Sequence, residues 1–157
     1  MLKIPAGKSI IISIVLTVIF MAILVYGAFS IVEIVDAFIL FENTVVKYST
    51  IGETGRIFIL ISAYVVLAVA ALADVLMLLL LLEVRAGRVF MDKSIACVRY
   101  VSWCCLIIGL IFAVLGRFFV LMFVFGAVVI FLGLCLRVVK NALEEASAIK
   151  SENDLTI

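Results

Sequence analysis

Four long apolar runs with almost no charges occupy most of this chain, and they restrict it to folds that use lipid as their solvent. The runs lie at about residues 10–32, 57–82, 95–116 and 118–136, and the first run has no charged residue in 23 positions. Hydrophobic residues make up 68% of the chain, against roughly 45–50% in ordinary soluble proteins. A small soluble domain buries only about two-thirds of the surface that its chain exposes. The sequence therefore predicts an integral membrane protein.

The length of the runs predicts helices. About 20 apolar residues at a rise of 1.5 Å each cross a hydrocarbon core of about 30 Å, whereas barrel strands would be half as long and would alternate apolar with polar residues. We expect an all-α, integral membrane four-helix bundle in which residues 1–157 form a single domain. The tail, 137–157, has apolar residues at helical spacing and predicts an amphipathic cytoplasmic helix.

The distribution of basic residues predicts the topology. With four spans, the N-terminus, the 83–94 loop and the tail share one side of the membrane. That side holds nine lysine and arginine residues, against three on the other side. By the positive-inside rule, both termini are expected in the cytoplasm, as in a multi-pass protein of the bacterial plasma membrane. No basic patch has the size that direct nucleic-acid binding needs.

The links between the runs carry further structural signals. Residues 33–56 have their polar positions on one helical face, so we expect the first helix to continue beyond the membrane or to lie on its surface. A bare turn around Gly116 and Arg117 predicts that the last two spans form an antiparallel hairpin. Small residues recur every seven positions on both of these spans, which favours a close helix crossing; they are Ser102, Gly109 and Gly116 on one span and Gly126 and Gly133 on the other.

Asp74 is the most informative single residue, because a carboxylate inside a span costs roughly 2.5–3.5 kcal/mol on insertion scales. It must face protein, water or a cation. Arg99, about one turn inside the third span, is the expected partner, and the two form a candidate intramembrane polar pair. Thr17 and Tyr26 are weaker polar candidates. The pair could serve a proton or ion relay, or it could be an internal ion pair that fixes helix register.

The sequence gives little support to catalysis or to metal binding. The chain has no histidine and none of the usual catalytic motifs, so we expect no enzyme activity and no catalytic residues. Its cysteines lack the spacing of a metal site, so no metal and no cofactor is expected; they are Cys97, Cys104, Cys105 and Cys135.

Two segments resemble a known family. One is the loop Gly87-Arg88-Val89-Phe90-Met91-Asp92-Lys93-Ser94, followed by Val98-Arg99; the other is the terminal Glu152-Asn153-Asp154-Leu155-Thr156-Ile157. With four spans in about 160 residues, the chain resembles the bacterial domain-of-unknown-function 2975 family. Val98 stands where the family often has leucine. The resemblance brings no established activity, but it implies a small helix-turn-helix transcriptional regulator as a partner, since such regulators are commonly encoded beside its members.

The two segments have plausible roles of their own. Gly87 can turn the chain, while Phe90, between Arg88 and Lys93, can enter the interface and let the cations meet anionic headgroups. The terminal Leu155 and Ile157 could be captured by a partner or could fold back toward Phe90.

Two hypotheses of function follow. In the first, a non-enzymatic membrane protein senses or signals by holding a cytoplasmic partner at the membrane. In the second, the chain is a small transporter, immunity or efflux component that uses Asp74 as an intramembrane polar site. The lipid bilayer is a partner in both, and the sequence leaves the oligomeric state open.

Overall fold

The computed structural model describes residues 6–46, 51–87 and 92–154, with side chains described over 9–44, 51–87 and 92–150. It contains four long helices: α1 (Ala6–Phe41), α2 (Glu53–Arg85), α3 (Asp92–Leu115) and α4 (Val120–Asp154). A short π-helical segment, η1 (Glu42–Val46), continues α1. No residue in the described ranges lies in a strand, and the predicted all-α fold is confirmed.

All four of these helices are long and apolar enough to cross a membrane. In hydrocarbon, every backbone N–H and C=O must be satisfied inside the segment, which is why such sequences form helices. Their large apolar side chains point outward, as with Phe29 of α1, which is 84% exposed. An exposed apolar surface of this extent suits lipid and not water, so the chain is a membrane protein.

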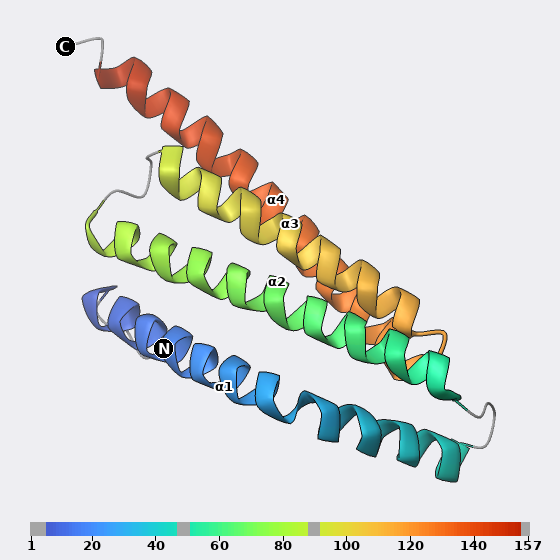
Figure 1. Ribbon diagram of the computed structural model, residues 1–157. Helices are drawn as coiled ribbons and strands as arrows, with labels where there is room; N and C mark the ends of the chain where they lie inside the picture. Colours follow the sequence, from blue (N-terminus) through green and yellow to red (C-terminus); the bar gives the residue numbers. More distant parts are fainter. Residues whose placement is uncertain (1–5, 47–50, 88–91, 155–157) are drawn as a thin grey trace, which may run out of the picture.

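The helices pack in chain order, as Figure 1 shows. Helix α2 packs against both α1 and α3, and α3 packs against α4. Within the described residues, no backbone contact joins α1 to α3 or α4. We call the end where residues 116–119 join α3 to α4 the turn end, and the end where α2 leads into α3 the loop end. The loop end corresponds to the side that the positive-inside rule places in the cytoplasm.

Helices α3 and α4 approach closely along the predicted small-residue stripes. A Cβ built on Gly126 would lie 2.8 Å from both the Ala113 nitrogen and the Gly109 oxygen. One heptad away, the buried Ser102 hydroxyl donates a hydrogen bond of 2.8 Å to the Gly133 carbonyl oxygen. Only residues without a large side chain allow such backbone approach, and the stripes therefore set the register of this hairpin.

The turn and the tail differ in detail from the prediction. Helix α3 ends at Leu115 and α4 begins at Val120, so the predicted third and fourth runs extend one and two residues into the turn. The Phe118 and Phe119 backbone N–H groups both donate to the Leu115 carbonyl oxygen, at 2.9 and 3.1 Å, and these bonds close the turn. At its other end, α4 runs without a break from the fourth apolar run to Asp154. The tail is thus a continuation of the span itself.

The first link follows one of the two predicted forms. Helix α1 continues nine residues past the apolar run that ends at Val32, and η1 then extends it to Val46. The Asn43 side-chain oxygen accepts a hydrogen bond of 3.0 Å from the Ile51 backbone N–H, which ties η1 to the start of α2. At this turn end, the Phe38 and Phe119 rings meet edge to face at 5.7 Å.

Candidate functional site

Asp74 lies on α2, and only 7% of its surface is exposed. The cleft that it lines is otherwise formed by α1, with five residues of that helix: Leu16, Thr17, Ile19, Phe20 and Ile23. Its Oδ2 atom is buried and has no hydrogen-bond partner in the described part of the chain. Thr17, one of the weaker sequence candidates, is the nearby polar residue, but its hydroxyl donates to the Ser13 carbonyl oxygen at 2.9 Å. Among the described residues, this buried oxygen of Asp74 therefore lacks the hydrogen-bond partner that its environment requires.

The expected pair between Asp74 and Arg99 is wrong. The Arg99 guanidinium instead donates to Glu144 of α4, with Nη2 2.9 Å from Oε1. Two features explain the difference. Asp74 faces α1, on the other side of α2 from the hairpin, and the unbroken extension of α4 brings a carboxylate alongside the first turns of α3. An exposed arginine pairs more readily with a carboxylate at the solvated end than with one inside the apolar layer.

Arg99 belongs to a cationic cleft between α3 and α4, which is lined by Arg99, Trp103, Arg137, Lys140 and Asn141 and has a volume of about 250 Å³. The Arg137 guanidinium lies 4.3 Å from the centroid of the Trp103 ring. Lys140 donates to Glu144, with Nζ 2.7 Å from Oε2, so Glu144 joins Lys140 to Arg99. These contacts hold the pKa of Glu144 below its ordinary value, first through the Lys140 hydrogen bond and also through that from Arg99.

This cleft was not predicted from the sequence. Arg99 was expected to pair with Asp74, and no role in a site was predicted for Trp103, Arg137 or Glu144. A signal was nevertheless present, since the seven-residue spacing of small residues sets the antiparallel register. That register places the start of the α4 extension beside the first half of α3.

Most of the other predicted site residues lie at the edge of the described chain. Gly87 has a φ of 76°, in the left-handed region that favours glycine, and it turns the chain at the end of α2. Arg88, Val89 and Phe90 lie outside the described residues. The terminal motif is divided: the backbone of 152–154 is helical, nothing is described of those side chains, and 155–157 fall outside the described residues.

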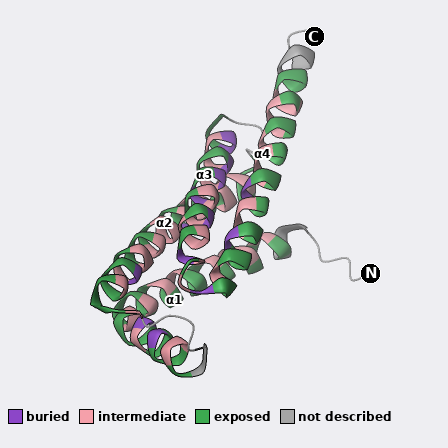
Figure 2. Cartoon of the chain, turned by 90° about the vertical axis from the view of Figure 1, so that its right-hand side faces the viewer, coloured by how far each residue is buried: buried purple, intermediate pink, exposed green. Residues whose placement is uncertain are grey.

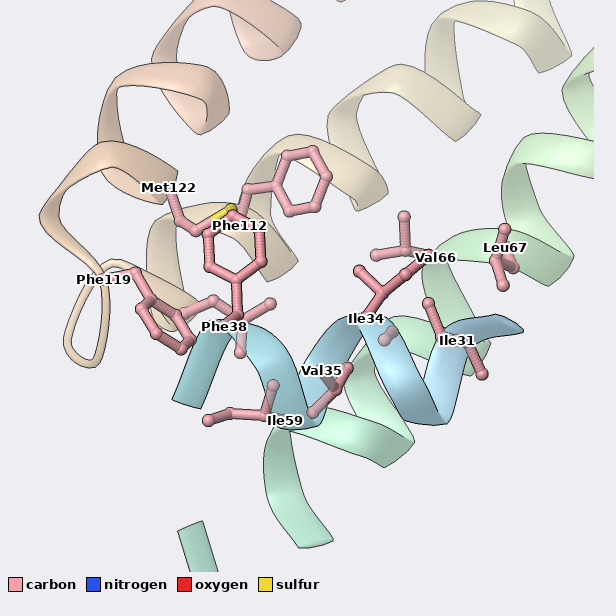
Figure 3. A pocket seen from close by; sticks show the side chains of 12 residues that line it. Ile31, Ile34, Val35, Phe38, Ile59, Val66, Leu67, Phe112, Phe119 and Met122 are labelled. Atoms are coloured by element: carbon pink, nitrogen blue, oxygen red, sulfur yellow. The ribbon is translucent and has the colours of Figure 1, made fainter. Parts of the chain in front are cut away.

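The turn end holds a cavity with a different character, shown in Figure 3. It measures about 230 Å³, and all twelve lining residues are apolar, among them Val35, Phe38, Ile59, Phe119 and Met122. Such a space can accept hydrocarbon, but it has no polar group that would orient a ligand. It therefore gives no specific chemistry. In the described parts of the chain, no three histidine, cysteine, aspartate or glutamate side chains gather as a metal site.

An exposed ion pair ties α1 to α2 near this cavity. Arg56 donates through Nε to Asp36 Oδ1 at 2.5 Å and through Nη2 to Oδ2 at 2.8 Å. Asp36 lies beyond the first apolar run. The hydrogen bonds from Arg56 are the main cause that lowers the pKa of Asp36 from its ordinary value of 3.8. A carboxyl whose pKa falls on folding stabilises the fold above its unfolded pKa, and this stabilisation is lost as the pH falls through the folded value.

We expect Arg56→Gln to lower the thermal midpoint in detergent slightly at pH 7. The difference from wild type should vanish as the pH falls through and below 3.8, because Asp36 then becomes protonated in both proteins. Arg117→Gln, a change of the same kind at the same end, should show no such convergence. A gap between wild type and Arg56→Gln that stays constant down to pH 3 would contradict this role of the ion pair.

The comparisons with known proteins agree with the resemblance drawn from the two short segments. A family model described as protein of unknown function (DUF2975) matches residues 42–157. The match includes α2, α3 and α4, and with them Asp74 and the cationic cleft. No curated protein and no solved structure matches the chain. Since the family model covers well over half of the sequence, the chain belongs to the DUF2975 family of proteins of unknown function.

Proposed function

We propose that this protein is a non-enzymatic plasma-membrane protein that senses or signals by holding a cytoplasmic partner at the membrane through the extension of α4. The observation that carries the proposal is the continuity of α4 from the apolar run to Asp154. Because Ser102 lies opposite Gly133, the first residue of α3 lies opposite about position 143. Roughly ten further residues, or about 15 Å of helix, extend past α3 (Figures 1 and 2).

The extension has the composition of a docking helix. Leu143, Ala146 and Ile149 follow one another at a spacing of three, and Ile149 is 55% exposed. Amphipathic helices that offer such a stripe are bound in apolar grooves of partner proteins. The Arg99–Glu144 ion pair joins the base of the extension to α3, while Lys140 pairs with Glu144 within α4. A change in hairpin packing would therefore move the extension, which is what a membrane signal requires.

The family resemblance supports a small helix-turn-helix regulator as the partner. Attachment to the membrane would keep such a regulator away from its DNA sites. Both termini would then lie in the cytoplasm, in agreement with the excess of basic residues at the loop end. Membrane attachment needs no catalytic group, which fits a chain without histidine.

Co-purification tests this function. A small helix-turn-helix regulator of the kind encoded beside family members should be recovered with the full-length protein. Recovery should fall at least about tenfold with Ile149→Glu, because a charge would be buried in the docked face. Glu145→Gln, on the polar face of the same helix, should leave recovery unchanged. A version ending at Lys150 separates the helix from the terminal motif, since full recovery with it would remove residues 151–157 from the mechanism. Equal recovery with Ile149→Glu and wild type would contradict docking on the extension.

A second candidate function is supported by Asp74. A buried carboxyl without a partner, in a cleft between α1 and α2, is the arrangement expected of an intramembrane ion or substrate site. The chain would then be a small transporter, immunity or efflux component. The described helices pack in chain order without a central pathway between them, so transport would require an oligomer. An Asp74→Asn variant tests this candidate in proteoliposomes, where loss of ion- or substrate-coupled uptake is expected.

A further inference from the structure

The cationic cleft between α3 and α4 has more positive charge than the structure neutralises. Arg99, Arg137 and Lys140 line it, while Glu144 accepts hydrogen bonds from Arg99 and Lys140. Among the described residues, Arg137 contacts no carboxylate, and its recorded contact is with the face of the Trp103 ring. The cluster thus has three cations and one carboxylate. This excess of two positive charges favours an anionic ligand.

The geometry of Arg137 leaves its hydrogen-bond donors available. Stacking on an aromatic ring uses the face of the guanidinium, whereas its five N–H groups point outward in the plane. Asn141 lies one helical turn further along α4, on the same face as Arg137, and it also lines the cleft. A planar fork of donors with a neighbouring amide matches the oxygens of a phosphate group, which arginine binds in bidentate fashion.

The surroundings of the cleft indicate that the phosphate belongs to a lipid. Arg137 directly follows the fourth apolar run, and the side chains beside the cleft are apolar and exposed: Trp103 is 51% exposed and Val138 is 68% exposed. Arginine at the end of a span is typical of the headgroup layer of a bilayer. Trp103, in the middle of α3, lies on the hydrocarbon side of Arg137, because its neighbour Ser102 lies opposite Gly133. A ligand with a phosphate next to hydrocarbon chains fits both features, whereas a free anion would use only the charges.

We propose that the Arg99–Trp103–Arg137–Lys140–Asn141 cleft is a binding site for the phosphate of an anionic phospholipid. Anionic headgroups are favoured over zwitterionic ones, because the charge of Glu144 is already balanced by Arg99 and Lys140, which leaves little attraction for a headgroup ammonium. A bound lipid would also bridge α3 and the base of the α4 extension, since the lining residues come from both helices.

Trp103 makes the test direct, because it is the single tryptophan of the chain and lies in the cleft. The protein, purified in a neutral detergent, is titrated with short-chain phosphatidylglycerol, and the midpoint of the Trp103 fluorescence change is measured. Phosphatidylcholine of the same chain length and inorganic phosphate form the other two arms. We expect a saturable change with phosphatidylglycerol and midpoints at least about tenfold higher in both other arms.

Substitutions then assign the site. Arg137→Gln should raise the phosphatidylglycerol midpoint roughly tenfold, because charge-assisted hydrogen bonds are lost. Arg85→Gln removes a cation at the same end but outside the cleft and should not change the midpoint. If Arg137→Gln does not fold, Lys140→Gln replaces it, with an increase in the midpoint expected again. Equal midpoints for the two lipids, or an unchanged midpoint in the folded cleft variant, would overturn the proposal. Saturation by inorganic phosphate at the concentration of the lipid would show a free-anion site and would also overturn it.

Discussion

A Gly126→Ala variant is expected to unfold more easily than wild type, with a loss of roughly 1–3 kcal/mol in the free energy of unfolding. A Cβ at this position would lie 2.8 Å from two backbone atoms of α3, the Ala113 nitrogen and the Gly109 oxygen. Backbone atoms cannot rotate away as a side chain can, so the two helices must move apart. In lipid, helix association depends on close packing and hydrogen bonds and not on exclusion of water, so this separation is costly.

Gly27→Ala is the matched control for this prediction. It places the same methyl group on α1, where the nearest atom, Leu67 Cδ2, would lie at 3.8 Å, an ordinary van der Waals contact. Both substitutions raise helix propensity by about 1 kcal/mol, so Gly27→Ala should be neutral or slightly stabilising. The measurement is the unfolding midpoint in mixed micelles of neutral detergent and sodium dodecyl sulfate, followed by circular dichroism. Equal midpoints for the two variants would show that α3 and α4 do not meet along the glycine stripe.

Replacing Asp74 by leucine is expected to stabilise the protein, by about 1–3 kcal/mol. The buried Oδ2 atom has no partner among the described residues, and leucine removes the unsatisfied group while its branched side chain can extend into the cleft that Asp74 lines. Asp74→Asn should give a smaller gain, because an amide in the same place also needs hydrogen bonds. Thr17→Val, in the same cleft, should change little, because the Thr17 hydroxyl bonds only to its own helix.

The same variants separate the two proposed functions. If Asp74→Asn is at least as stable as wild type but abolishes ion- or substrate-coupled uptake in proteoliposomes, the carboxyl is a transport site. Full recovery of the regulator with Asp74→Asn would show that the carboxyl is not needed for partner binding. Destabilisation by Asp74→Leu would contradict the expectation, since it would mean that the carboxyl has a stabilising partner in the membrane. Arg99→Leu should add its effect independently of Asp74, because the two side chains share no contact.

The membrane fold could be predicted from the sequence because it depends on local properties. Long apolar runs must form helices in hydrocarbon whatever their neighbours, and each predicted run lies in a helix apart from residues at the 116–119 turn. The stripes of Gly109, Gly126 and Ser102 also predicted a close α3–α4 crossing, because a spacing of seven keeps residues on one face of any helix. The amphipathic pattern beyond Arg137 correctly predicted a helix in the tail.

The partners of the charged side chains were decided only by the tertiary structure. The sequence placed Asp74 about one turn deeper in the membrane than Arg99, within reach of a long side chain, but depth does not specify which face of α2 meets which neighbour. Asp74 turned out to face α1, and Arg99 pairs with Glu144 because α4 continues unbroken alongside α3. The contact between the Arg137 guanidinium and the Trp103 ring likewise depends on how α4 packs alongside α3. Pairing between side chains requires the rotation and register of whole helices, which follow from packing over many residues, whereas helix formation in lipid requires only the chain's own backbone and apolar surface.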